Sequence, residues 1–369
     1  MEITDVTATT HRVPVEPPLM DEVHETTFTH VEIETDEGIT GYGITGSSWQ
    51  HAIRSFINRE AAPIVVGQDP MRVERIWDDL HRGLNQRDQT GVWSSGVSAI
   101  DIALWDIKGK YLDEPVWRLL GGANDPVQAY VTFGHHHYSK SELVEVAERL
   151  VDDGETRLKM IVGTGHGLET KDPVDIQRDA ERVRAVREAV GDGVDLMVDA
   201  NFTLAVDEAL ELSKRIEQYD IAFFEEPVYG NDTGLLVELK NRIGIPIAAG
   251  QNEGHRFRHR ELIESGAVDI CMPNVAYTGG YTEARKVAAL AESFNLRLAN
   301  GGGWPHHNVQ LHAGVANGWL VEYHYTLWKA GEKIFEDPPT IDGGEVSPPD
   351  APGVGLVPDH DALDGFRIE

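Results

Sequence analysis

The second half of the chain alternates short apolar runs with helical stretches, and this rhythm limits the fold more than any other feature. The runs are VQAYVTFG, TRLKMIVG, VDLMVDAN, IAFFEEP, IPIAAGQN, VDICMPN, LRLANGG and WLVEYHY. Continuous apolar runs are typical of parallel strands, which are buried on both faces. Helical patterns separate several of them, at residues 175–190, 205–219, 255–265 and 281–294. Eight strand–helix units predict an α/β fold, a (β/α)8-type barrel over residues 126–326.

The beginning of the chain has a different pattern. Residues 3–14 and 27–45 alternate like antiparallel strands, with a hairpin turn at the sequence DEG. Helical patterns follow, the longest in SAIDIALWDIKGKYL, before a glycine pair that stops the segment. These features predict an N-terminal α+β domain over residues 1–125. Residues 327–369 are rich in Pro and Gly, and we expect them to return to that domain.

The charge of the chain excludes several classes of partner. The 369 residues include 32 Lys and Arg against 62 Asp and Glu, so the formal net charge is −30. Such an acidic chain repels nucleic acid and anionic membrane surfaces, so we expect neither as a partner. No apolar stretch is long enough to span a bilayer and the N-terminus does not resemble a secretory signal, which favours a cytoplasmic protein.

Two further compositional features bear on the environment of the chain. A single cysteine, Cys271, excludes intrachain disulfides and a cysteine-based zinc site. The scarcity of lysine beside the acidic excess indicates a halophilic protein, because concentrated salt screens the self-repulsion of the carboxylates. The alternative is an acidic protein from an ordinary cytoplasm.

The ends of the apolar runs carry the candidate functional residues, because function in a barrel lies at the carboxyl ends of the strands. Asp199, Glu225 and Gln251 end three successive runs at a spacing of 26 residues. Three oxygen donors on neighbouring strands suit one Mg²⁺ ion. The alternative is that such acids only cap the following helices. Arg157 and Lys159 lie two positions apart in the second run, hence on one face of its strand.

Motifs spread over the whole chain carry a family resemblance. They are SAIDIALWDIKGKYLDEPVWRLLGG, TRLKMIVG, DLMVDAN, FFEEPV, PIAAGQN, GGYTEARKVAALAESF and PGVGL. Together they resemble the mandelate racemase/muconate lactonizing enzyme group of the enolase superfamily. The resemblance implies a capping domain with substrate-specificity loops and a barrel that holds Mg²⁺. It also implies abstraction of the proton α to a carboxylate, with the enediolate stabilised on the metal.

The resemblance assigns roles to the strand-end residues. It implies that Asp199, Glu225 and Gln251 stand at the metal-ligand positions and that Lys159 is the base. Lys159 must be neutral to accept a proton, and we expect the metal and Arg157 to lower its pKa by like-charge repulsion. Arg157 stands where the family has another lysine, and it can only hold charge in place because it stays protonated.

Three positions depart from the family pattern. Gln251 replaces an acidic ligand, and Glu253 is an alternative third ligand on the same strand face. Asn274 ends the sixth run, where many relatives carry the Asp of an Asp–His dyad. The seventh run leads into GGGWPHH, where the nearest match to the histidine of that dyad is a glycine. We expect His306 to act as the catalytic histidine, with His307 as the alternative.

Further polar residues are expected around the substrate. His24 and Trp49 belong to loops of the first domain that resemble those covering the barrel mouth, and HHH follows the first apolar run. The candidate substrate-binding residues are therefore His24, His136, Asn201, Asn274 and Glu322.

These expectations converge on a Mg²⁺-dependent hydro-lyase that dehydrates a sugar acid to a 2-keto-3-deoxy acid. Lys159 takes the α-proton, and His306 protonates the departing β-hydroxyl group. A racemase, epimerase or cycloisomerase of a carboxylate substrate is the first alternative. A non-catalytic homologue with a degraded site is the second, suggested by Gln251 and Asn274. Because members of the family usually assemble, we also expect a homo-oligomer.

Overall fold

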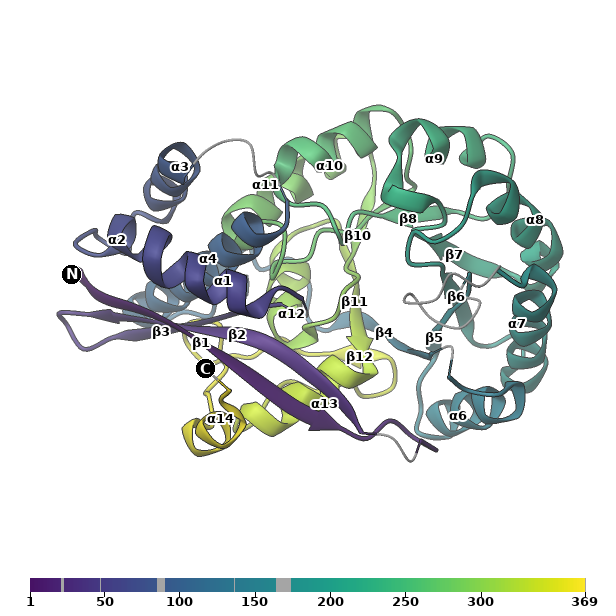
Figure 1. The fold of residues 1–369 in the computed structure, drawn as a ribbon, viewed down its shortest axis with the longest axis horizontal. Helices are drawn as coiled ribbons and strands as arrows, with labels where there is room; N and C mark the ends of the chain where they lie inside the picture. Colours follow the sequence, from purple (N-terminus) through teal and green to yellow (C-terminus); the bar gives the residue numbers. More distant parts are fainter. Residues whose placement is uncertain (21–22, 47, 85–89, 136, 164–173, 369) are drawn as a thin grey trace.

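The computed structural model describes residues 1–20, 23–46, 48–84, 90–135, 137–163 and 174–368. Two units lie side by side, a three-stranded antiparallel sheet with its helices and a closed parallel barrel (Figure 1). The expected fold class, an α/β barrel with an N-terminal α+β capping domain, is confirmed.

The eight barrel strands coincide with the eight apolar runs. They are β4 (Val127–Gly134), β5 (Arg157–Ile161), β6 (Asp195–Asp199), β7 (Ile221–Glu225), β8 (Ile247–Ala249), β9 (Ile270–Cys271), β10 (Arg297–Ala299) and β11 (Gly318–His324). Each strand pairs in parallel with the next, and β11 pairs with β4 to close the barrel. The carboxyl ends of all eight strands therefore face one mouth.

Helices cover the outside of the barrel, as the helical patterns of the sequence predict (Figure 1). They are α6 (Lys140–Asp152), α7 (Ile176–Val190), α8 (Val206–Ile216), η2 (Glu217–Tyr219), η3 (Tyr229–Asn231), α9 (Thr233–Lys240), α10 (His255–Glu264), α11 (Gly280–Ser293) and α12 (Pro305–Gly314). Buried side chains of α6, α7, α8 and α9 form one continuous apolar core with the outer faces of the strands.

The cap is built on strands β1 (Ile3–Val15), β2 (His24–Thr35) and β3 (Thr40–Thr45), with the predicted hairpin between β2 and β3. Its helices are α1 (Gln50–Phe56), η1 (Ile57–Ala61), α2 (Ala62–Val65), α3 (Val73–Leu84), α4 (Val92–Leu112) and α5 (Val116–Leu120). Helix α4 corresponds to the long helical pattern of the sequence. It is buried along most of its length, as expected for a helix with partners on several sides.

Helix α4 joins the cap to the barrel. A Cβ atom on Gly43 would lie 1.9 Å from the Ala99 carbonyl oxygen, so glycine allows β3 to lie directly on the helix. On another side, Trp105 Nε1 donates a hydrogen bond to Thr282 Oγ1 of α11 at 2.9 Å. The cap is therefore seated on the barrel through a helix that is buried along most of its length.

The last segment of the chain contributes to both units. It contains α13 (Tyr325–Ile334), β12 (Glu345–Val346) and α14 (His360–Phe366). Strand β12 pairs antiparallel with β4 of the barrel, while α13 and α14 contact β1 of the cap. The amide of Ile368 donates a hydrogen bond to the Thr10 carbonyl at 2.9 Å. This segment thus packs against both the barrel and the cap.

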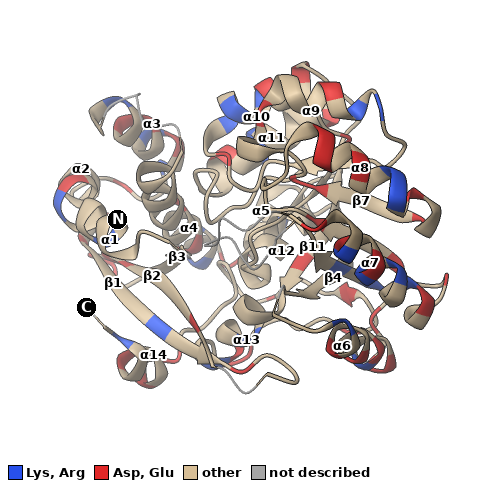
Figure 2. Ribbon diagram, turned by 45° about the vertical axis from the view of Figure 1, so that its right-hand side comes forward, with Lys and Arg blue, Asp and Glu red and all other residues tan. Residues whose placement is uncertain are grey.

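Acidic residues are spread over the outer helices of the barrel and over the cap (Figure 2). None of the helices in the described ranges has the length and apolar composition needed to cross a bilayer.

Candidate active site

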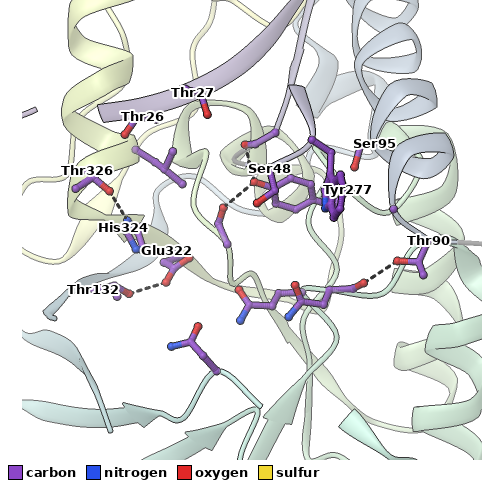
Figure 3. A pocket seen from close by; sticks show the side chains of 18 of the residues that line it. Thr26, Thr27, Ser48, Thr90, Ser95, Thr132, Tyr277, Glu322, His324 and Thr326 are labelled. Carbon is purple, nitrogen blue, oxygen red and sulfur yellow. Dashed lines mark hydrogen bonds between the residues drawn. The ribbon is translucent and has the colours of Figure 1, made fainter. Parts of the chain in front are cut away.

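A cavity of about 550 Å³ opens at the mouth of the barrel, between the strand ends and the cap (Figure 3). The barrel contributes charged and amide side chains to its wall, including Asp199, Gln251 and Glu322. The cap contributes hydroxyl groups, from Thr26, Thr27, Ser48, Thr90, Ser94 and Ser95. The cavity therefore combines an acidic floor with a wall that can hydrogen-bond to many hydroxyl groups.

Lys159 lies beneath this cavity in a fully buried cluster of carboxylates. Its Nζ atom is 2.8 Å from Glu322 Oε1 and 3.2 Å from Asp199 Oδ2, and it also pairs with Glu225. Burial lowers the pKa of Lys159, but the carboxylates of Glu225, Glu322 and Asp199 outweigh burial and hold it well above its usual value. The amine is therefore the counter-ion of the acidic floor.

Strand register brings these residues together. Ile161 at the end of β5 is the partner of Asp199 on β6, and Asp199 is the partner of Glu225 on β7. Lys159 precedes Ile161 by two positions and so stands one level deeper in the barrel. Burial raises the pKa values of both Asp199 and Glu225, because each carboxylate loses water and faces other acids.

Glu322 anchors the opposite side of the cluster. Its carboxylate accepts hydrogen bonds from Thr132 Oγ1 and from the amide of Gly303, both at 2.6 Å. Burial raises the pKa of Glu322, but Lys159, His324 and the hydrogen bond from Thr132 outweigh burial and lower it overall. Glu322 is therefore a carboxylate fixed between β4, β5 and β10.

The donors at the ends of β6, β7 and β8 suit a hard cation. Gln251 Nε2 donates to Glu226 Oε2 at 2.7 Å, which leaves Gln251 Oε1 free to face the floor. A Cβ on Gly301 would lie 2.3 Å from Glu225 Oε1 and 2.7 Å from Gln251 Oε1, so both oxygens border one space. Glu225 Oε1 is buried and has no hydrogen-bond partner. Two carboxylates and an amide oxygen are ligands that Mg²⁺ accepts.

The third ligand position is occupied by an amide rather than an acid. In the described part of the chain, no group of three or more His, Cys, Asp or Glu side chains is arranged to hold a metal ion. A cation at this place therefore depends on the Gln251 oxygen. Glu253, the alternative from the sequence, does not line the cavity, and Arg258 Nε pairs with it at 3.1 Å.

The structure corrects the expectation for Arg157. This residue begins β5, at the end of the strand that is remote from the mouth. Its guanidinium donates to the Gly344 carbonyl at 3.1 Å and pairs with Asp195 at 3.5 Å. Arg157 therefore neither lines the cavity nor contacts Lys159, and it cannot lower the pKa of that amine.

The expectation for His306 is also corrected. His306 and His307 lie in the first turn of α12, are buried, and do not line the cavity. The ring of His306 packs 5.9 Å from that of Phe335, and neither of its nitrogens has a hydrogen-bond partner. Burial lowers the pKa of His306 to about 3, so the ring is neutral. A left-handed turn at Trp304 starts the helix and directs both histidines away from the mouth.

Asn274 has a structural place instead of the expected contact with substrate. Its Nδ2 atom donates to the carbonyls of Gly301 and Gly303 at 2.7 and 3.0 Å, and its Oδ1 atom accepts from Asn308 Nδ2 at 3.0 Å. The side chain is fully buried and does not line the cavity. Asn274 therefore holds the glycine loop after β10 in position.

The other expected substrate contacts lie at or near the mouth. Asn201 lines the cavity, as does Trp49, whose side chain is 75% exposed. His24 lies at the start of β2 beside the rings of His135 and His137, at centroid distances of 6.2 and 5.7 Å. His136 lies outside the described residues.

Sequence reasoning missed His324. It is the last residue of β11 and lines the cavity. The signal was present in the sequence, because His324 follows Glu322 by two positions and side chains two apart share a face of a strand.

Comparison with known proteins agrees with this geometry. Residues 2–121 match the family described as mandelate racemase/muconate lactonizing enzyme, N-terminal domain, and residues 142–362 match the family described as enolase C-terminal domain-like. The chain belongs to the mandelate racemase/muconate lactonizing enzyme group of the enolase superfamily. Membership of this superfamily of enzymes makes the cavity a candidate active site.

Individual relatives are enzymes that act on sugar acids or are named as racemases. An arabinonate dehydratase from Saccharolobus solfataricus is 32% identical, over 90% of this chain and 89% of that protein. A 3,6-anhydro-α-L-galactonate cycloisomerase from Streptomyces coelicolor is 31% identical, over 97% of each chain. The crystal structure of a racemase from Streptomyces coelicolor with bound magnesium has a TM-score of 0.90 at 30% identity, covering 99% of this chain and all of that one.

Proposed function

We propose that this enzyme removes the proton α to the carboxylate of a sugar acid and expels the β-hydroxyl group as water. The product is an enol that tautomerises to a 2-keto-3-deoxy acid. The observation that carries the proposal is the placement of Lys159, directly beneath the cavity, in contact with Glu225 and with Asp199 and Glu322, which line the cavity. An amine in contact with acids on three other strands is placed to transfer a proton at the point where an acid substrate would end.

The wall of the cavity supports a polyhydroxylated substrate. Six residues of the cap with hydroxyl side chains line the cavity, and Asn201 and Asn252 add amide groups from the barrel. A cavity of about 550 Å³ lies within the range of small-molecule sites, roughly 300–1,000 Å³. Such a lining favours an aldonic or aldaric acid over an aromatic or aliphatic one.

We propose one Mg²⁺ ion as the cofactor, held by Asp199, Glu225 and Gln251. When bound, the ion would supply positive charge to the substrate carboxylate. It would also neutralise the carboxylates around Lys159 in place of the lysine. Lys159 then has the role of base at Nζ, and Glu322 orients that amine through its 2.8 Å contact. Asn201 follows Asp199, the last residue of β6, by two positions and lines the cavity, where it would bind substrate oxygen atoms.

Cycloisomerisation is the second candidate function. It begins with the same α-proton and differs in the group that leaves. The observation that favours it is the cycloisomerase relative, which matches this chain over 97% of its length. A racemase would need a second base on the opposite face of the substrate.

We also propose a domain division at residues 125 and 326, a cytoplasmic and salt-adapted protein, and a homo-oligomer. The net charge of −30 disfavours nucleic acid and membrane partners. It also repels a small anionic substrate, so we propose that local positive charge at the barrel mouth attracts that substrate.

A panel of aldonic, aldaric and anhydro-sugar acids tests the function. The purified enzyme is incubated with each acid and Mg²⁺ in deuterated water, and products are followed by NMR. Formation of a 2-keto-3-deoxy acid supports dehydration, whereas a ring-opened or rearranged product without loss of water supports cycloisomerisation. Deuterium uptake with all hydroxyl groups retained indicates a racemase. Absence of both product and exchange across the panel would overturn the proposal.

A further inference from the structure

Three residues on adjacent strands stand at one level of the barrel. His324 on β11 is the register partner of Thr132 on β4, and Thr132 is the register partner of Lys159 on β5. Since neighbouring strands lie about 4.8 Å apart, the backbones of His324 and Lys159 are separated by roughly 10 Å across Thr132. His324 lines the cavity and Lys159 lies beneath it, so a substrate in the cavity would lie within reach of both strands.

The side chain of His324 faces the interior. Glu322 points inward, because it contacts Lys159 and Thr132, and His324 follows it by two positions on the same face of β11. Figure 3 shows the imidazole beside the Glu322 carboxylate at the edge of the cavity. It is partly exposed, whereas Glu322 below it is buried. His324 therefore reaches the substrate space above the carboxylate cluster.

One nitrogen of this imidazole is already engaged. His324 Nδ1 lies 3.0 Å from Thr326 Oγ1, a contact that orients the ring and leaves Nε2 for the substrate (Figure 3). The ring of His135 lies against it at a centroid distance of 5.3 Å. His306 and His307, by contrast, are buried in α12 and do not line the cavity.

We propose that His324 is the second catalytic residue of this site, the acid that protonates the departing β-hydroxyl group through Nε2. The inference rests on the proposed dehydration. Lys159 Nζ accepts the α-proton, and the electron pair of that C–H bond forms the new carbon–carbon double bond. The β C–O bond breaks, and its electron pair takes the proton from His324 Nε2 to give water. The step starts from the protonated imidazole; burial lowers the pKa of His324, and the adjacent Glu322 carboxylate acts in the opposite direction. The imidazole is left neutral and the lysine charged, so a proton returns to one group and leaves the other before the next turnover.

The two proton transfers can be measured separately. A His324→Asn variant keeps a side chain that can hydrogen-bond to Thr326 but carries no acid. With a sugar acid that the wild type dehydrates, we expect keto-acid formation to fall by about 10²-fold or more. Exchange of the α-proton for deuterium depends on Lys159, and we expect it to persist in the recovered substrate. A Lys159→Ala variant should lose both.

Controls separate the catalytic role from folding. A His360→Asn variant replaces an exposed histidine on α14, which does not line this cavity, and should keep both reactions. The thermal unfolding midpoint of His324→Asn should match that of His360→Asn.

Several outcomes would overturn the inference. If His324→Asn dehydrates at the rate of the wild type, another group is the acid. If it loses exchange and keto-acid formation to the same extent while remaining folded, His324 acts with Lys159 at the first step. If the wild type itself shows neither reaction with any acid, the proposed function fails and not only the role of His324.

Discussion

The two halves of the barrel mouth differ in how directly the chain places their side chains. Along β5 to β8, residues at or next to the strand ends meet at the floor, as Lys159, Asp199, Glu225 and Gln251 do. After β10, the chain enters a glycine loop, and the histidines that follow it, His306 and His307, are buried in a helix. The position of a side chain at the mouth can therefore be predicted from its strand only where the backbone continues the direction of that strand.

The glycine loop explains the difference in physical terms. Gly302 and Gly303 have positive φ values, and so does Trp304. The chain therefore turns back immediately after β10, where a regular strand would have continued toward the mouth. Gly303 then serves the site with its backbone amide, which donates to Glu322.

The largest expected effect tests the first half of the mouth. A Lys159→Ala variant removes the proposed base, and keto-acid formation should fall by about 10³-fold or more, as for loss of a general base. The measurement is the steady-state rate with a sugar acid that the wild type accepts. A variant that keeps full activity while folded would show that the carboxylate cluster has no base at Lys159.

The second prediction concerns the amide ligand of the same half. Gln251→Glu combined with Glu226→Gln exchanges the two members of one hydrogen bond and moves a negative charge onto the proposed metal ligand. We expect the double variant to bind Mg²⁺ at least about 10-fold more tightly, because a charged ligand replaces a neutral one. Isothermal titration calorimetry without substrate measures this directly.

The matched control is the single Gln251→Glu variant. It places two carboxylates side by side and loses the hydrogen bond from Nε2, so its gain in affinity should be smaller than that of the exchange. If the wild type and the double variant bind Mg²⁺ with equal affinity, Gln251 is not a metal ligand.

The third prediction tests the second half of the mouth through His306. Its folded pKa of about 3 lies below the usual histidine value near 6.5, because burial disfavours the charged ring. Below pH 6.5 the unfolded chain binds a proton that the native chain does not. The contribution of His306 to stability is therefore complete above pH 6.5 and is lost progressively as the pH falls toward 3.

A His306→Leu variant removes this proton uptake and an imidazole without hydrogen-bond partners. Its free energy of unfolding should exceed that of the wild type by an amount that grows by about 1 kcal/mol per pH unit below pH 6. Activity should stay within about twofold, since the ring does not line the cavity. Denaturant unfolding at pH 7 and pH 5, with parallel rate measurements, checks both statements. A large loss of activity would show that His306 takes part in catalysis.

The smallest expected effect concerns salt and the charge of the whole surface. Screening of the acidic residues over both units should raise activity several-fold between dilute buffer and molar KCl. The floor itself is buried and should respond little, so KM for the acid substrate should change more than kcat. If activity falls as the KCl concentration rises above that of dilute buffer, the protein is not salt-adapted. That result would leave the proposed enzymatic function unaffected.

The fold followed from periodicity because each apolar run is long enough to define a buried strand, even where β9 contains only Ile270 and Cys271. The proximity of Asp199, Glu225 and Gln251 could be predicted because these residues recur at the spacing of one strand–helix unit. Arg157 was misplaced because periodicity gives the face of a strand but not which end a residue occupies. His324 was missed because it lies in a run that ends in three aromatic or ionisable residues, where the last inward position depends on register with β4.

The return of the chain to the cap has a consequence for biosynthesis. Strand β1 is synthesised before the barrel, whereas α13 and α14, which contact it, are synthesised after the barrel. The 3.0 Å contact between His11 Nδ1 and the Leu363 carbonyl joins residues that are 352 positions apart. It can form only once Leu363 has been synthesised. The cap can therefore close only after the barrel has been synthesised, and a chain truncated before α13 exposes an apolar sheet face to chaperones and proteases.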